Sequence, residues 1–422
     1  MILKNKILRL INSLFCALTM TTVLSSCSMI NDSPEPVVPP EPEPEPAQTT
    51  ILIYAVATNS LSVNLTADKS EMLVGASEID LDKNNIFVFE TQYKYNADNK
   101  RTSNVALVKL VKDKETGECE WETVGEYNDG VGSLNPTRIR EIINYVTENN
   151  ESDHYGLIFW SHSTASQPYF DDTTRGEKAC DETNRVSLPM QYSFGQDLTY
   201  SNGDAEYQIN IDDLSAAVPD NLFDFIWFDS CYMSNIETIY QFRNKCNTFV
   251  GYPTEVLDAG LPYQYAIPKM VGGTPDLVGA AEEFFSYYSD KFGTIAVVDM
   301  TKIETLAEAC ARLYGKYNVS SGSLMKYSRY STGPFYDLGD YTKELVNQGG
   351  GELTQEEWEE ILQECVLYSA TTTKYYLPDL NVINKERFSG ISTHLYTFLE
   401  NDSEAEAFYK SLDWYKRVFE NE

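Results

Sequence analysis

The chain has 422 residues, of which 42% are hydrophobic, so it is long enough for one large domain or two ordinary ones. Its formal net charge is −32, from 32 Lys and Arg against 64 Asp and Glu. Such an acidic chain repels nucleic acids and anionic lipid surfaces, which excludes nucleic-acid binding, whereas basic peptides and cations are attracted.

Residues 1–26 are predicted to be a targeting segment rather than part of the fold. Three basic residues precede an apolar stretch over residues 10–24, which is too short to span a membrane comfortably. The stretch ends in Leu-Ser-Ser-Cys, so Cys27 occupies the position of the lipidated cysteine in a bacterial lipobox. We expect an exported lipoprotein of the cell envelope, anchored in the outer membrane; the alternative is an ordinary secretory signal cleaved nearby.

A tether is predicted over residues 27–50, because the alternating Pro and Glu of residues 39–46 favour an extended, stiffened chain. The globular body then begins at Ile51 with an apolar run typical of a buried strand. Residues 86–89 and 105–108 are predicted as further strands.

A helix and a buried strand lead to the first candidate catalytic residue. Asn135 is expected to cap the helix and Pro136 to occupy its first position, with aliphatic residues behind them at helical spacing. The next run, residues 155–160, is aromatic and aliphatic without alternation, as in a strand covered on both faces. It ends shortly before His162.

A second run of the same character, residues 223–228, ends shortly before Cys231. A polar stretch over residues 163–208, expected to be a loop, and a short helix over residues 211–218 precede it. Because parallel strands place their chemistry at their carboxyl ends, we expect His162 and Cys231 to meet at one edge of a sheet. They would act there as a thiol nucleophile and its base.

The residues after Cys231 predict a helix. Ser234 and Glu237 match a capping box, and the helix is expected to continue through Cys246. Cys231 would then lie at a helix N-terminus, where the helix dipole lowers the pKa of the thiol.

Strands and helices continue to alternate, with a strand over residues 248–252, a helix over 275–288 and a strand over 295–298. This alternation predicts a doubly wound, parallel α/β sheet. The mixed remainder contains two further capping-box spacings and one strand, at Thr301 with Glu304, at Thr354 with Glu357, and over residues 391–396.

Neither Cys231 nor His162 alone is strong evidence for a catalytic site. A cysteine at a strand end is usually just buried, and a lone histidine is usually a hydrogen-bonded core residue. The pair is stronger evidence, since both follow strands of the same character. Of the other histidines, His154 is expected in a polar loop and His394 in a late strand. The six cysteines beyond the signal are widely spaced without a CxxC pair, which indicates mostly buried thiols and no zinc site, although disulfides stay possible in an exported protein.

The segment Phe-Ile-Trp-Phe-Asp-Ser-Cys-Tyr-Met-Ser, residues 225–234, resembles the hydrophobic-Asp-Ala-Cys-Leu-Met nucleophile motif of clostripain-like cysteine peptidases. Residues 155–162 resemble that family's strand ending in Trp-Asp-His-Gly. The resemblance covers about residues 51–300 and the strand at 389–392. It implies the α/β/α sandwich of the clan of caspases, gingipains and legumain, with a mainly parallel central sheet and a mixed α/β region over 301–422.

The resemblance also implies roles for individual residues. Cys231 would be the nucleophile and His162 the general base, with the backbone N–H groups of Cys231 and Ser163 binding the oxyanion. The family usually has Gly after the histidine. Ser163 stands there instead, and it would be strained by roughly 1–2 kcal/mol if the loop needs a positive φ.

Two aspartates are candidates for a specificity pocket. Asp229 matches the family aspartate that binds a basic side chain, and the alternative is a buried carboxylate that orders the adjacent turn. Asp258 is a looser match, and a solvated loop aspartate is the alternative. The resemblance thus implies cleavage after Arg or Lys.

Relatives are often cut between the two strands and often respond to calcium. Arg175, Lys178 and Arg185 are candidate processing positions, because a polar loop tolerates nicking. The dyad requires no cofactor and no metal site is assigned, since the acidic residues of the same loop fit no EF-hand spacing. These residues are Asp171, Asp172, Asp181 and Glu182.

The sequence therefore predicts a surface-anchored, monomeric cysteine endopeptidase that cleaves peptides and proteins at basic residues. One alternative is a catalytically silent surface lipoprotein that binds peptide or glycan through the same groove. Another is an esterase or transferase that uses the same dyad. Selective alkylation of Cys231 separates the silent protein from the enzymes.

Overall fold

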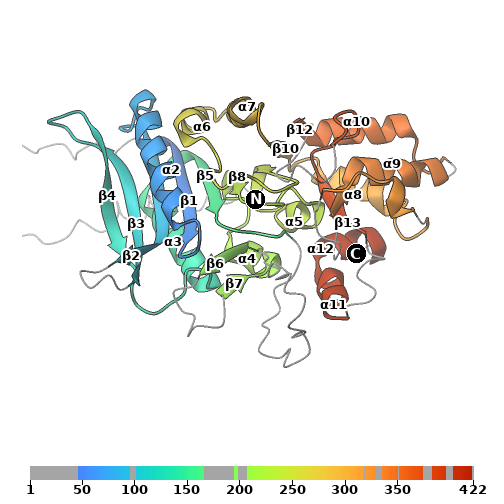
Figure 1. The fold of residues 1–422 in the computed structure, drawn as a ribbon, viewed down its shortest axis with the longest axis horizontal. Helices are drawn as coiled ribbons and strands as arrows, with labels where there is room; N and C mark the ends of the chain where they lie inside the picture. The colour runs from blue at the N-terminus through green and yellow to red at the C-terminus, as the bar shows by residue number, and fades with distance from the viewer. Residues whose placement is uncertain are drawn as a thin grey trace, which may run out of the picture. The chain divides into compact units, whose positions relative to one another are not determined.

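The computed structural model describes residues 46–95, 101–165, 194–197, 207–317, 319–327, 335–349, 351–373, 383–395 and 403–420. Within these residues, a nine-stranded sheet forms the middle layer, in the order β12-β10-β9-β8-β5-β1-β2-β3-β4 (Figure 1). Its strands are β1 (Ala47–Ala57), β2 (Asn84–Tyr95), β3 (Arg101–Lys112), β4 (Cys119–Glu126), β5 (Ser152–Trp160), β8 (Phe223–Asp229), β9 (Cys246–Gly251), β10 (Thr294–Asp299) and β12 (Val366–Thr371).

The central strands of this sheet run parallel. β1 pairs in parallel with β2 and β5, and β8 with β5 and β9. The predicted mainly parallel sheet is therefore confirmed. β10, however, is antiparallel to β9, where the alternation predicted a parallel strand. Two packed helices, α6 (Tyr263–Met270) and α7 (Leu277–Tyr288), separate the two strands. The second helix returns the chain to the edge of the sheet at which β9 ends. β10 therefore starts at that edge and runs antiparallel to β9.

Helices cover both faces of the sheet, as the alternation of β1 illustrates. Ile51 and Ile53 belong to the core under α2 (Ser62–Gly75), α6 and α7, whereas Leu52 and Tyr54 belong to the core on the opposite face. All four side chains are buried, which is why the strand is a continuous apolar run. The three-layer α/β/α sandwich predicted from the sequence is thus confirmed.

The opposite face is covered by helices from the whole chain. They are α3 (Pro136–Asn149), α4 (Ile211–Ala217), α5 (Ile236–Gln241), α8 (Ile303–Ala311), α9 (Leu338–Gln348), α10 (Gln355–Cys365), α11 (Ser403–Ser411) and α12 (Asp413–Tyr415). The single-turn elements are Ala76–Glu78, Ser321–Ser323 and Lys416–Glu420. The residues after 300 also supply β12 to the central sheet, so they share its cores.

Some predicted helix caps are confirmed and others are wrong. Asn135 caps α3 with Pro136 behind it, and Thr354 forms the capping box of α10. Ser234 does not cap α5: the helix begins one residue later, with Asn235 as the cap, and ends at Gln241. α8 has no side-chain cap. A hydroxyl at the right spacing does not cap when it binds elsewhere: Thr301 Oγ1, for instance, donates to Asp299.

Three further segments differ from the prediction. β1 begins at Ala47, within the stretch assigned to the tether. The polar stretch after His162 contains β6 (Phe194–Asp197) and β7 (Tyr207–Ile209), which pair with each other. His154 lies in β5 and not in a loop. The late strand is confirmed as β13 (Ser392–His394), which pairs with β11 (Phe335–Asp337).

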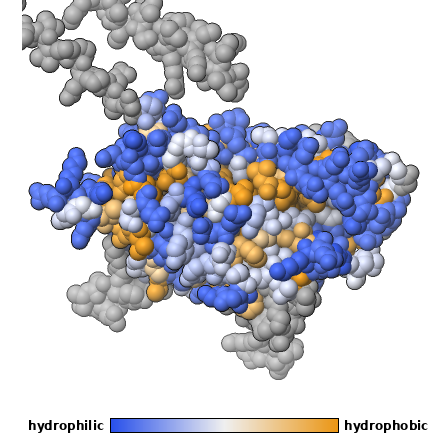
Figure 2. All heavy atoms as spheres, turned by 90° about the horizontal axis from the view of Figure 1, so that it is seen from above, coloured by the Kyte–Doolittle hydropathy of each residue, from blue (hydrophilic) through white to orange (hydrophobic). Residues whose placement is uncertain are grey.

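The surface seen in Figure 2 is largely hydrophilic, with apolar patches between the charged side chains. Among the described residues, Val63 and Val74 of α2 are the most exposed large apolar side chains, at 79% and 64%. Scattered apolar residues of this kind are normal on soluble domains. In the part of the chain that the structure describes, no helix has the length and hydropathy needed to cross a membrane.

Candidate active site

The register between β5 and β8 brings the two predicted catalytic residues to one edge of the sheet. Trp160 lies opposite Asp229 in this parallel pair. His162 and Cys231 each follow two residues later, at the carboxyl ends of their strands. Both side chains are half-buried. The predicted meeting of a histidine loop and a cysteine loop at this edge therefore matches the sheet order.

Ser163 ties the two loops together directly. Its hydroxyl donates to the backbone carbonyl of Cys231 across 2.6 Å. The carbonyl of His162 accepts from the N–H of Gly195 at 2.8 Å, and Ser163 forms an isolated bridge with Phe194. β6 therefore holds the histidine loop from the other side.

Ser163 does not carry the backbone strain expected from the sequence. Among the described non-glycine residues, φ is positive at Ala165 (60°), Asn221 (54°) and Tyr232 (63°), and Ser163 is not one of them. The left-handed residue of the cysteine loop is thus Tyr232, directly after Cys231. Its N–H donates to Thr254 at 2.9 Å, which helps to hold this costly conformation.

The expected helix dipole does not reach Cys231. α5 begins at Ile236 and has six residues, and the dipole effect fades within the first turn of a helix. The Cys231 thiol lies 3.8 Å from the carbonyl oxygen of Val256 instead. Cys231 therefore lies five residues before the first residue of α5, and the predicted place of the thiol at a helix N-terminus is wrong.

The C-terminal part of the chain supports the cysteine loop. Ser234 donates its hydroxyl to the carbonyl of Gly390 at 2.7 Å, and Ser392 donates its N–H to the carbonyl of Ser234 at 2.8 Å. Glu237 of α5 is fully buried and accepts from the N–H of His394 at 3.1 Å. Residues far beyond 300 thus fix the turn that presents Cys231.

His162 has a partner that the sequence did not indicate. Its Nε2 atom lies 2.8 Å from the hydroxyl of Ser60, which follows β1. β1 is the neighbour of β5, so three adjacent strands contribute to the site. The preceding residue, Asn59, donates to the carbonyls of Val56 and Gln196, both at 2.9 Å. No local motif marks Ser60, because its role arises from the strand order.

Asp229 is buried and fully engaged in hydrogen bonds. It accepts from the N–H of Leu261 at 3.1 Å, from Tyr263 at 3.0 Å and from Tyr252 at 3.2 Å. Gly260 packs against the carboxylate at a left-handed φ of 56°, where a Cβ atom would lie 2.8 Å from it. Burial raises the pKa of Asp229 to about 6, although the three donors lower it in part.

Two further acids lie beside Asp229 and were not predicted. Asp68 of α2 accepts from the indole of Trp160 at 2.8 Å, and burial together with the charge of Asp229 raises its pKa to about 9. Glu71 accepts from the N–H of Tyr263 at 3.0 Å, and burial raises its pKa too. The two residues are spaced along an ordinary helix, so the sequence gives no signal for this acidic cluster.

The remaining candidates are placed as follows. Asp258 is exposed on the loop between β9 and α6. His154 lies near the start of β5, at the opposite end of the strand from His162, with Nδ1 3.3 Å from Asp224. His394 is buried, and burial lowers its pKa to about 3, so it stays neutral. His162 is therefore the histidine positioned for acid–base chemistry among the described residues.

Several predicted positions lie outside the described residues. They are Cys27, Arg175, Lys178, Arg185 and the acids Asp171, Asp172, Asp181 and Glu182. Among the described residues, no group of three or more His, Cys, Asp or Glu side chains is arranged to hold a metal ion.

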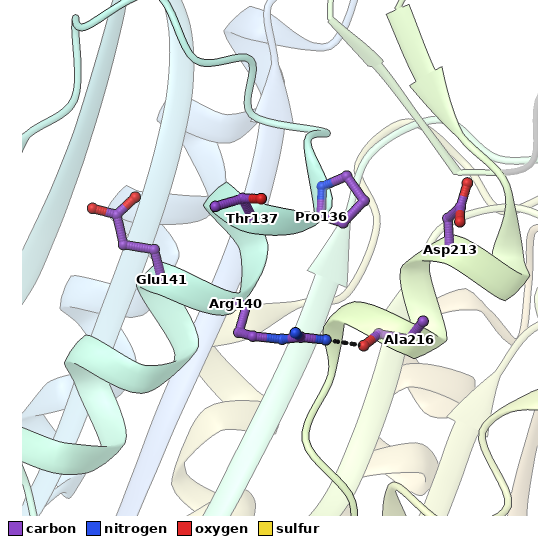
Figure 3. Close-up of a pocket in the computed structure, with 6 residues that line it drawn as sticks. All are labelled: Pro136, Thr137, Arg140, Glu141, Asp213 and Ala216. Atoms are coloured by element: carbon purple, nitrogen blue, oxygen red, sulfur yellow. Dashed lines mark hydrogen bonds between the residues drawn. The ribbon is translucent and has the colours of Figure 1, made fainter.

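A surface pocket of about 340 Å³ lies between α3 and α4 (Figure 3). Arg140 crosses it and donates to the carbonyl of Ala216. The other lining residues are Pro136, Thr137, Glu141 and Asp213. The pocket contains neither a thiol nor a histidine, so it offers no nucleophilic chemistry.

Comparison with known proteins identifies the family of the chain. A model of the clostripain family matches residues 53–419. In sequence, the chain is similar to clostripain of Hathewaya histolytica, with 25% identity over 243 residues. That match covers 54% of this chain and 43% of clostripain, so it spans less than half the length of that relative.

Two solved structures are similar over almost their full length. One is a secreted C11 cysteine protease from Bacteroides thetaiotaomicron in complex with an irreversible peptide inhibitor, with a TM-score of 0.71 and 25% identity. The other is an inactive zymogen C11 protease from Parabacteroides distasonis, with a TM-score of 0.69 and 26% identity. Each match covers 89% of this chain and 99% of the other chain.

Proposed function

Because the chain belongs to the clostripain family, whose solved members are cysteine proteases, we propose that it is an endopeptidase with Cys231 as nucleophile and His162 as general base. The observation that carries this proposal is the tie between the two loops. The Ser163 hydroxyl bonds the Cys231 carbonyl, and the strands before both residues are paired in register. A thiol and an imidazole presented in this way can share a proton.

The reaction follows from these two groups. His162 takes the proton of Cys231, and the thiolate sulfur bonds to the scissile carbonyl carbon as the C=O electrons move to oxygen. The imidazolium then gives its proton to the amine nitrogen as the C–N bond breaks, which leaves a thioester. Water, deprotonated by His162, adds to the thioester; the C–S bond breaks and the thiol regains its proton.

The backbone N–H groups of Ser163 and Cys231 are proposed to bind the oxyanion. Peptide donors at fixed positions stabilise the charge that develops on the carbonyl oxygen in the transition state. The support is that the Ser163 side chain holds its own backbone against that of Cys231. The positions of both donors therefore depend on the same hydrogen bond.

Cleavage after Arg, and more slowly after Lys, is proposed from the buried carboxylate of Asp229, beside which Asp68 and Glu71 lie. A guanidinium would supply the positive charge that these buried carboxyls lack. Because Asp229 already accepts three hydrogen bonds, an arginine would have to displace one of them. The hydroxyls of Tyr252 and Tyr263 can rotate away, whereas the N–H of Leu261 cannot. The exposed Asp258 is a second, weaker candidate contact.

The decisive test measures peptide cleavage. Purified chain is incubated with a library of internally quenched peptides, beside its Cys231→Ala variant and a Cys119→Ala control. Cleavage that is lost only in the Cys231→Ala variant supports the endopeptidase. Peptide binding without turnover would favour the catalytically silent binding protein. Turnover of esters without amides would favour the esterase.

Processing and anchoring are proposed from the sequence. Self-cleavage after Arg175, Lys178 or Arg185 would agree with the inactive zymogen described for the Parabacteroides distasonis relative. Fragment masses should change when the cut residue is replaced, and an active, uncut chain would rule out processing as a requirement.

Lipidation of Cys27 is tested by Cys27→Ser. If Cys27 carries the lipid anchor, this variant should leave the membrane fraction or fail to mature. Unchanged mass and fractionation of that variant would contradict the anchor.

A further inference from the structure

On the basis of the peptidase function proposed above, we propose that Ser60 is a positioning residue for His162. Its hydroxyl would fix the ring so that Nε2 carries the proton and Nδ1 faces the thiol of Cys231. Ser60 belongs to no sequence motif and is an exposed serine in the turn between β1 and α2.

The contact follows from the order of the strands. Ala55 of β1 lies opposite Trp160 of β5, so the turn after β1 and the loop after β5 leave the sheet at the same edge. Ser60 Oγ lies 2.8 Å from Nε2 of His162, the distance of a good hydrogen bond.

The turn that carries Ser60 is fixed on both sides. The side chain of Asn59 is 4% exposed and donates to Val56 and to Gln196 of β6, both at 2.9 Å. Its oxygen accepts from the N–H of Leu61 at 2.8 Å, which closes the turn around Ser60. The serine hydroxyl is therefore presented to the histidine by a rigid backbone, and little entropy is lost when the bond forms.

The chemistry of the dyad determines which partner donates. A neutral imidazole has one N–H and one lone pair. Nε2 is occupied by Ser60, so the lone pair that takes the thiol proton belongs to Nδ1. Ser60 must then accept from the Nε2–H. The same bond persists when His162 becomes an imidazolium, and it strengthens because its donor is then charged. Ser60 thus stabilises the protonated histidine of the thiolate–imidazolium pair.

Loss of the hydroxyl should narrow the pH profile of the enzyme. Without Ser60 Oγ, the imidazolium is less stable. The imidazolium is present both before and after the thiol loses its proton, so the acid limb stays in place. The alkaline limb, where the imidazolium loses its own proton, moves to lower pH. A serine that only shaped the turn would leave both limbs in place.

The kinetic test compares Ser60→Ala with Ser60→Thr, which keeps the hydroxyl on an exposed position. Ser70→Ala is the control, since Ser70 is an exposed serine of α2 that bonds only within its helix. We expect Ser60→Ala to lower kcat about ten- to a hundredfold with little change in KM, and to move the alkaline limb to lower pH by about one unit. Ser60→Thr should restore most of kcat and most of the position of the alkaline limb. Unchanged kcat and limbs in Ser60→Ala would overturn the proposal.

A second test needs no peptidase activity, so it separates this proposal from the proposed function. The chain has three histidines, and ring nitrogen NMR of the Cys231→Ala protein can follow each of them. The His162 signals are assigned by their loss in a His162→Gln variant. We expect the proton on Nε2, and a fall in the His162 pKa by about one unit in Ser60→Ala but not in Ser60→Thr. A proton on Nδ1, or an unchanged pKa, would overturn the role of Ser60 whether or not the chain cleaves peptides.

Discussion

The hydroxyl of Ser163 donates a 2.6 Å hydrogen bond to the backbone carbonyl of Cys231, so the histidine loop holds the cysteine loop in place. The serine is 5% exposed, which protects this bond from competing water. The residue that departs from the family's usual glycine therefore has a structural role that glycine cannot fill.

Ser163→Ala should lower both stability and activity. Loss of one buried hydrogen bond costs about 0.5–1.5 kcal/mol. If the transition state loses the same amount of stabilisation, kcat/KM falls by about two- to tenfold. Thermal unfolding and peptide cleavage measure the two effects. Ser230→Ala is the matched control: among the described residues Ser230 Oγ is buried without a hydrogen-bond partner, so its removal should not destabilise the protein.

The same geometry predicts the outcome of restoring the family residue. φ at Ser163 is not positive, so Ser163→Gly relieves no strain, removes the hydroxyl with the rest of the side chain and makes the backbone more flexible. It should be no more active than Ser163→Ala. A Ser163→Gly enzyme more active than the wild type would show that serine hinders the oxyanion site.

Cys231 should be the most reactive thiol among the cysteines that the structure describes. Cys246, Cys310 and Cys365 are buried, and burial raises the pKa of Cys310 and of Cys365 to about 12 and that of Cys246 still further. Thiolate is the reactive form, so these three should resist alkylation. Mass spectrometry after a short exposure to iodoacetamide should find Cys231 modified at least tenfold faster than any of these three buried cysteines.

The half-buried Cys119 is the internal comparison for this experiment, since it has similar access without a histidine loop beside it. His162→Ala should slow the alkylation of Cys231 towards the rate of Cys119. Equal rates for Cys231 and Cys119 in the unchanged protein would mean that the dyad is idle.

Glu237 predicts that stability falls as the pH rises. Burial raises its pKa to about 7, although Thr393, Tyr409 and the N–H of His394 donate to it. The folded-state pKa lies above the ordinary value of 4.5. The protonated carboxyl therefore makes its full contribution to the stability of the fold below about pH 4.5. That contribution is lost as the pH rises through 7, because ionisation is then easier in the unfolded chain.

Glu237→Gln removes this titration. In a Cys231→Ala background, which prevents self-digestion, the Tm of Glu237→Gln relative to its parent should increase from pH 5 to pH 8. The change in unfolding free energy should be on the order of 2–3 kcal/mol. Glu360→Gln, an exposed glutamate of α10, controls for the loss of charge. A constant difference between Glu237→Gln and its parent across this range would contradict the prediction.

The sequence predicts those residues of the site that follow a strong local pattern. The apolar runs before His162 and Cys231 indicate buried strands, and parallel pairing then places both residues at one edge. Ser60 and Asp68 escape notice because a turn serine and a helical aspartate have no pattern of their own. They reach the site only through the order β8-β5-β1 and through packing of α2 on the sheet.

Helix starts and strand directions are less well specified by local patterns. Ser234 and Asn235 are both good caps, and the choice between them depends on the contact of Ser234 with Gly390 in a segment distant in the sequence. The direction of β10 depends on whether α6 and α7 count as one crossover or two. Tertiary contacts decide both, so no spacing rule reveals them.

Asp229 provides the test of specificity. Loss of a buried charge-assisted contact costs on the order of 2–4 kcal/mol, or about thirty- to a thousandfold in kcat/KM. Asp229→Asn should therefore lose activity on Arg peptides far more than on neutral ones. Asp290→Asn, at an exposed aspartate between α7 and β10, is the matched control. Asp68→Asn should also keep the Arg preference, since the pKa of about 9 leaves Asp68 uncharged at pH 7.

The pH dependence of Arg cleavage follows from the same carboxyl. Burial raises the pKa of Asp229 to about 6, so it is ionised at pH 7.5 and increasingly protonated below pH 6. A protonated carboxyl cannot pair with a guanidinium, so kcat/KM for Arg peptides should fall between pH 7 and pH 5 relative to that for neutral peptides. Asp229→Asn should abolish this difference. If the unchanged enzyme prefers Asp, Asn or large apolar residues to Arg and Lys, Asp229 only orders the turn and its three hydrogen bonds are its whole function.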